Sequence, residues 1–139
     1  MAAAVATAPP VTLRDLVDKS LVQQRRDGLL VSHPLVRQYA AARLAADDAR
    51  RTEVRRRHAQ AVLEALASSN EQPAPLIDDA IAAWRWAIEH DDFGLMESSC
   101  DGLVRLIERS GRSQQGLGLL TAARSSLDDR ATRRRPSPN

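Results

Sequence analysis

The sequence predicts a mainly α protein that contains one small β-hairpin near its start. Aromatic residues make up only 3% of the 139 residues, while alanine, leucine and arginine are abundant, so the core should be aliphatic and helix-favouring. Leu21-Val22 and Leu29-Leu30-Val31 flank a polar run that ends in glycine, which is typical of a two-stranded hairpin. After residue 76 the apolar residues recur at helical spacing only.

The chain begins with MAAAVATAPP, which is apolar but short and lacks the basic head of a secretory signal. We therefore expect a disordered leader over residues 1–12. Thr12 suits the N-cap of a first helix, which begins at Leu13 and places Leu13, Leu16 and Val17 on one face. The polar run 23–27 and Gly28 should form the hairpin turn, with Gly28 in the left-handed conformation.

His33-Pro34 ends the second predicted strand, because the residue before a proline is extended and proline itself suits the first helical turn. The helix that follows runs to Ala46, with helical spacing of Leu35, Val36, Tyr39, Ala40 and Leu44. A helix, a hairpin and a helix in this order form the end of a winged helix. A complete winged helix has two more helices, so either the chain is a fragment of a larger protein, which we favour, or its later helices replace them.

The segments LRDLVDKSLV, LLVSHPLVRQYAAARLA and RRRHAQAVLEALA resemble the winged-helix segment of the STAND class of signal-transduction ATPases. The resemblance covers residues 13–66 and is to bacterial transcriptional regulators that carry helical repeats. It implies a preceding AAA+ or NB-ARC-like core that binds ADP and ATP, and a histidine that contacts the ADP phosphate in the off state. His33 matches that histidine, whereas Ser32 and Pro34 depart from the Met-His-Asp motif of plant resistance-type relatives.

A second long helix is predicted from Asp47 to Ala67, which completes a winged-helix region over residues 13–67. Its apolar stripe contains Val54, Ala61, Val62, Ala65 and Leu66, and its first half carries Arg50, Arg51, Arg55, Arg56 and Arg57. Because cations are slightly unfavourable at a helix N-terminus, these arginines are candidates for contact with phosphate or an acidic partner. The alternative, which we favour, is a solvated face paired with Asp47 and Glu53. We expect His58 to be packed or solvated, since no metal-ligating side chains cluster beside it.

Residues 68–75, SSNEQPAP, predict a linker. Residues 76–127 then predict a helical hairpin and one more helix, similar to a unit of a tetratricopeptide (TPR) solenoid, with turns at residues 90–92 and Gly111. The predicted apolar faces are, in the first helix, Ile77, Ala80, Ile81, Trp84, Ala87 and Ile88; in the second, Leu95, Met96, Leu103, Leu106 and Ile107; and in the third, Leu117, Leu120, Ala123 and Leu127.

Trp84 and Trp86 point about 200° apart on one helix, so both cannot enter a small core. Trp84 should be buried, while Trp86 is either an anchor for a protein partner or covered by the helix at 47–67. Residues 128–139 contain Arg133-Arg134-Arg135 and Pro-Ser-Pro, which predicts a disordered basic tail with weak, non-specific attraction to nucleic acid.

Several functions are disfavoured by what the sequence lacks. It contains no Gly-rich P-loop and no nucleophile with a matched histidine, so we do not expect an enzyme or a cofactor bound by this chain alone. It also contains no apolar run long enough to span a membrane, so we do not expect a membrane protein. A single cysteine, Cys100, fits a reducing cytoplasm.

Two functions remain. One is a regulatory, protein-interaction module for signal transduction and transcription regulation, docked on an ATPase core and with a protein partner on the helical region. The other is a small DNA-binding winged helix with residues 13–19 in the major groove, which Asp15 and Asp18 disfavour because they would face phosphates.

Overall fold

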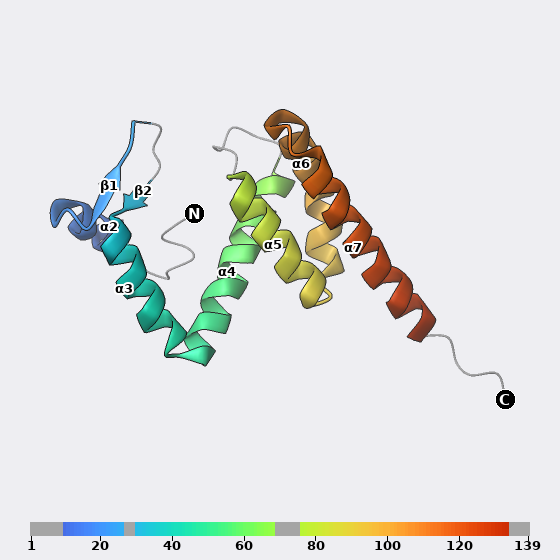
Figure 1. Cartoon of the computed structure of the whole chain (residues 1–139), viewed down its shortest axis with the longest axis horizontal. Coiled ribbons are helices and arrows are strands. Elements are labelled where there is room, and N and C mark those ends of the chain that lie inside the picture. Colours follow the sequence, from blue (N-terminus) through green and yellow to red (C-terminus); the bar gives the residue numbers. More distant parts are fainter. Residues whose placement is uncertain (1–9, 27–29, 69–75, 134–139) are drawn as a thin grey trace. The chain divides into compact units, whose positions relative to one another are not determined.

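The computed structural model describes residues 10–26, 30–68 and 76–133 of the chain. Within these residues the protein is mainly helical, as predicted, with six helices and one two-stranded antiparallel sheet (Figure 1). The chain divides into two compact units, unit 1 (Met1–Arg57) and unit 2 (His58–Asn139). The division lies inside helix α4 (Asp48–Ala67), whereas the sequence predicted one region that ends at residue 67 and a second that begins at residue 76.

Unit 1 contains α2 (Pro10–Asp18), β1 (Val22–Gln24), β2 (Leu30–Ser32), α3 (Pro34–Ala45) and the first half of α4. Helix α2 begins three residues before the predicted start, because the fixed φ angle of proline suits a first helical turn. Thr12 therefore lies inside the helix, and the prediction that it is the N-cap was wrong. Gly28 and the predicted leader residues 1–9 lie outside the described residues.

The hairpin forms where it was predicted, but β1 extends two residues further towards the turn and β2 ends one residue later than expected. Val22 pairs with Ser32, Gln23 with Val31 and Gln24 with Leu30. Two glutamines assigned to the turn are thus strand residues, since their backbones complete the ladder. The predicted junction after the hairpin is correct, because β2 ends at Ser32 and α3 begins at Pro34.

None of the described side chains of unit 1 is fully buried. The apolar faces predicted for α2 and α3 are half-buried at Leu13, Leu16, Val17, Val36 and Leu44. Helix α2 contacts β1, but Leu35 and Tyr39 of α3 are 68% and 66% exposed, and Val11 of α2 is 60% exposed. Most of the surface of these large apolar side chains is therefore exposed.

Unit 2 has the core that unit 1 lacks. It contains the second half of α4 together with α5 (Ile77–Glu89), α6 (Phe93–Ser110) and α7 (Ser113–Arg133), and the last three contact one another pairwise (Figure 1). The fully buried apolar residues are Ala59, Val62, Leu63 and Leu66 of α4, Ala80, Ile81, Ala83, Trp84 and Ala87 of α5, Met96, Leu103 and Ile107 of α6, and Leu119 and Ala123 of α7. Because α4 contributes four of them, its second half belongs to unit 2.

The turns of unit 2 follow local rules. The carboxylate of Asp92 caps α6 by accepting the backbone N–H of Leu95 at 3.3 Å. Gly111 ends α6 with a φ angle of 70°, the left-handed conformation that glycine adopts at little cost. The helical hairpin α5–α6 and the third helix α7 were thus predicted correctly.

Helix α7 differs from its prediction in two respects. It continues to Arg133, so residues 128–133 are helical rather than disordered, and the predicted tail beyond them lies outside the described residues. Its buried face is Gly116, Leu119 and Ala123, whereas Leu117 is 69% exposed. The face is rotated because Gly116 packs closely on Ile107, where an added Cβ would lie 2.5 Å from the Ile107 Cδ1.

Helices α4 and α6 approach each other closely at Gly102. A Cβ atom added there would lie 2.0 Å from the backbone oxygen of Leu66 and 2.7 Å from its carbonyl carbon. No side chain fits between the two backbones, so glycine at this position permits α6 to pack on α4.

Candidate functional site

His33 lies at the junction between β2 and α3, at the position predicted for a phosphate sensor. Its backbone is extended, with φ −57° and ψ 142°, and its Nδ1 accepts the N–H of Leu35 at 3.3 Å as the N-cap of α3. Because Nδ1 accepts, the proton of the neutral imidazole lies on Nε2, which is then a hydrogen-bond donor. His33 therefore has a structural contact through one ring nitrogen and a donor on the other.

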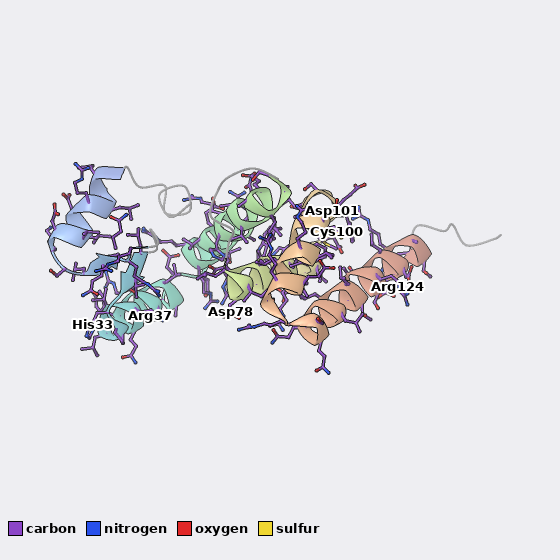
Figure 2. The ribbon with its side chains drawn as sticks, turned by 90° about the horizontal axis from the view of Figure 1, so that it is seen from above. His33, Arg37, Asp78, Cys100, Asp101 and Arg124 are labelled. Atoms are coloured by element: carbon purple, nitrogen blue, oxygen red, sulfur yellow. The ribbon has the colours of Figure 1, made fainter. Side chains whose placement is uncertain are left out.

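A cationic side chain, that of Arg37, lies near His33 on α3. Arg37 follows one turn later, and its backbone N–H donates to the His33 carbonyl at 3.0 Å. Both side chains are exposed and lie at the N-terminal end of α3 (Figure 2). Residues four apart on a helix share a face, so an anion that met the Nε2–H of His33 would also be near a guanidinium.

The arginines of α4 are engaged with acidic residues of the same helix. Glu53 accepts hydrogen bonds from Arg56 at 2.8 Å and from Arg57 at 2.7 Å, and Arg51 forms an ion pair with Asp48 at 2.6 Å. Asp47 accepts the backbone N–H of Arg50 at 2.9 Å, which caps the first turn. These pairs match the predicted solvated face, in which Glu53 and Asp47 were the expected partners.

The charge of Glu53 is stabilised by its two arginines. The hydrogen bond from Arg56, and after it the one from Arg57, lowers the pKa of Glu53 from 4.5 to about 2. The same pairing raises the pKa of Arg56. Glu53 therefore neutralises part of the arginine cluster at neutral pH. Arg50 and Arg55 are exposed, and their guanidinium groups form no ion pair among the described residues.

Trp86 occupies the outer side of α5, away from the buried Trp84. It is half-buried against the unit 2 core and stacks on His90, with ring centroids 4.2 Å apart and an interplanar angle of 15°. The Nδ1 of His90 also lies 2.8 Å from the Trp86 carbonyl oxygen. The two faces predicted for the tryptophans are thus correct, while the role of Trp86 in binding a partner stays a prediction.

His58 and Cys100 are the other side chains with potential chemistry that the sequence analysis considered. His58 lies 3.5 Å from Asp79, and Cys100 is a free, half-buried thiol on α6 (Figure 2). Among residues 10–26, 30–68 and 76–133, no three His, Cys, Asp or Glu side chains come together as a metal site. The same residues include no helix with the length and apolarity that a membrane crossing requires.

Comparison of the chain with protein-family models, with curated proteins and with solved structures found no match.

Two surfaces emerge that the sequence did not single out. One is the exposed apolar face of α3, whose signal was the i, i+4 spacing of Leu35 and Tyr39. The other is an open groove of about 560 Å³ in unit 2, with Phe93 and Leu127 among its lining residues. The second had no clear signal, because its residues come from the α5–α6 turn and from α7, which are more than 30 positions apart.

Proposed function

We propose that this chain is a non-catalytic regulatory module of a STAND-type transcriptional regulator, whose winged-helix region docks on a nucleotide-binding core. The observation that carries the proposal is the absence of a fully buried side chain among the described residues of unit 1. Large exposed apolar side chains that lie together are typical of a protein–protein contact.

The energetic argument supports a partner for unit 1. Burying one leucine-sized side chain stabilises a protein by about 1.5–3 kcal/mol relative to leaving it exposed. Val11, Leu35 and Tyr39 are each at least 60% exposed, so most of that stabilisation is not realised within unit 1. A docked core would supply the missing contacts.

The resemblance assigns His33 the role of the ADP contact, and its geometry is compatible with that role. The Nε2–H is available as a donor while Nδ1 holds the cap of α3, so a phosphate could be bound without breaking the helix junction. Unit 2 would then be the start of a helical sensor arm, with Trp86 and the arginines of α4 as candidate contacts for a protein partner. The single cysteine favours a cytoplasmic location.

The proposal is tested by the coding sequence immediately upstream of this chain and by its product. We expect that sequence to encode a P-loop nucleotide-binding domain, and the purified domain to bind the tagged chain. Val11→Asp should weaken binding at least tenfold, since it places a charge on the exposed face of α2 at a position where an acidic residue suits the helix start. Leu117→Asp is the matched control, because Leu117 is 69% exposed in unit 2.

An upstream sequence without a P-loop would contradict the proposal. So would a P-loop domain that binds the Val11→Asp and Leu117→Asp variants equally. The second outcome would place the contact away from Val11.

A further inference from the structure

The two units carry opposite net charge. Residues 1–57 contain 11 basic and six acidic residues, a net charge of +5, and residues 58–139 contain nine basic and 12 acidic residues, a net charge of −3. The nearly neutral total of +2 therefore conceals a charge separation along the chain. Such a separation favours association between unlike ends of two copies.

Helix α3 carries part of the positive charge of unit 1. It contains Arg37 and Arg43 but no acidic residue. Leu35, Tyr39 and Arg43 follow one another at intervals of four residues, so they line one face, and the two apolar members are 68% and 66% exposed. We call Leu35, Tyr39 and Arg43 the α3 face.

The groove of unit 2 has the complementary character. Its apolar part is formed by Phe93 and by Leu127, which is 46% exposed, and its rim carries Asp91 and Asp92. Asp91 accepts a hydrogen bond from Ser126 at 3.3 Å and Asp92 caps α6, each through a single carboxylate oxygen, Oδ1. The second oxygen of each can therefore accept from an added cation. We call Asp91, Asp92, Phe93 and Leu127 the acidic groove.

One cation is already present in the acidic groove. The guanidinium of Arg130 lies 4.9 Å from the centre of the Phe93 ring, which is a cation–π distance. The lining of the groove contains two carboxylates, Asp91 and Asp92, and one guanidinium, Arg130, so its net charge is negative. Elsewhere on this part of α7 the exposed Asp128 and Asp129 are offset by the exposed Arg124 and Arg133.

We propose that the α3 face of one copy of the chain binds in the acidic groove of a second copy. Leu35 and Tyr39 would cover Phe93 and Leu127, and Arg43 would meet the carboxylates of the groove. The contact joins two different surfaces, so it is head-to-tail, and it adds further copies unless the ring closes. This proposal does not rest on the regulator function. It concerns the chain without a docked nucleotide-binding core, because such a core would compete for Leu35 and Tyr39.

Sedimentation velocity of the purified chain at several protein concentrations tests the proposal. The wild-type chain should self-associate, and association should weaken at high salt because charge complementarity contributes to it. Leu35→Asp and Leu127→Asp each change an exposed side chain and should each weaken self-association at least tenfold. Leu117→Asp should associate like the wild type, and circular dichroism of every variant should match the wild type.

The decisive sample is an equimolar mixture of Leu35→Asp and Leu127→Asp. One variant retains the groove and the other retains the α3 face, so the mixture should form a two-chain complex and nothing larger. A mixture that stays monomeric would overturn the proposal, as would a wild-type chain that is monomeric at all concentrations. Self-association that neither variant weakens would also overturn it, since the contact would then lie elsewhere.

Discussion

Replacement of Gly102 by alanine should destabilise unit 2 by forcing α4 and α6 apart. The added Cβ would lie 2.0 Å from the Leu66 oxygen, whereas a carbon and a carbonyl oxygen in van der Waals contact are about 3.3–3.6 Å apart. The oxygen belongs to the backbone of α4, so it cannot rotate away as a side chain would. The helices must therefore separate by more than about 1 Å, the difference between these two distances.

The expected magnitude is the difference between two effects. Overpacking a well-packed core costs about 1–3 kcal/mol, and this contact belongs at the upper end because both groups are held in helices. Alanine regains about 1 kcal/mol, since glycine is the poorer helix former. We therefore expect Gly102→Ala to lower the free energy of unfolding by about 2 kcal/mol, which in a domain of this size lowers Tm by about 8–16 °C.

Gly118→Ala is the matched control. Gly118 also lies in a helix, but a Cβ added there meets no atom within 4 Å. It should therefore stabilise unit 2 by about 0.5–1 kcal/mol through helix propensity alone. Tryptophan fluorescence during urea unfolding is the assay, because both tryptophans lie in α5 and report on unit 2. A Gly102→Ala variant as stable as the wild type would refute the close approach of α4 and α6.

Three further predictions concern Gly111, Glu53 and DNA binding. Gly111→Ala should lower the free energy of unfolding by about 1–2 kcal/mol, because an L-residue is strained at a φ angle of 70°, and unchanged urea unfolding would contradict this. The carboxyl of Glu53 should titrate by NMR with a pKa of about 2 rather than the usual 4.5. Since folding lowers this pKa, its pairs with Arg56 and Arg57 should stabilise the fold above about pH 4.5 and lose that effect as the pH falls towards 2; a midpoint near 4.5 would show that the pairs do not form. DNA binding measured by fluorescence anisotropy should be weak, independent of sequence and lost with added salt, because Asp15 and Asp18 of α2 would face the phosphates. A sequence-selective footprint at moderate salt would contradict this prediction.

Helical periodicity predicted the buried face of α5, because apolar side chains at helical spacing form one face, and this face is buried whichever helices pack against it. It predicted the face of α7 only in part: Ala123 and Leu120 lie against the core, but Leu117 and Leu127 are exposed. Gly116 was missed because it has no side chain to count as apolar and is nevertheless buried against Ile107. Periodicity also predicted an apolar stripe on α4, but it did not predict which helices that stripe packs against. That the second half of α4 joins unit 2 depends on tertiary packing, of which Gly102 was an unrecognised sign.

Among the candidate site residues, the pairing of Glu53 could be predicted because it is local. Partners three and four residues away on a helix are neighbours by geometry alone. The cap formed by His33 could likewise be expected from its place before Pro34. The acidic groove could not, because it joins the α5–α6 turn to α7 across the fold.

The isolated chain should not retain ADP. One hydrogen bond to a charged group is worth about 1.5–3 kcal/mol, while micromolar affinity requires about 8 kcal/mol. His33 can therefore contribute to nucleotide binding only together with a nucleotide-binding core. Its loss there should speed ADP release by about tenfold to a hundredfold.

The rate of ADP release from the chain joined to the proposed nucleotide-binding core tests the proposed regulator function most directly. His33→Ala removes both the cap of α3 and the donor to phosphate, whereas His33→Asp restores a cap for the Leu35 N–H but places a negative charge near the phosphate. The account predicts that both variants release ADP at least tenfold faster than the wild type. Unchanged ADP release in both, with reduced thermal stability in His33→Ala alone, would contradict it and leave His33 as the cap of α3.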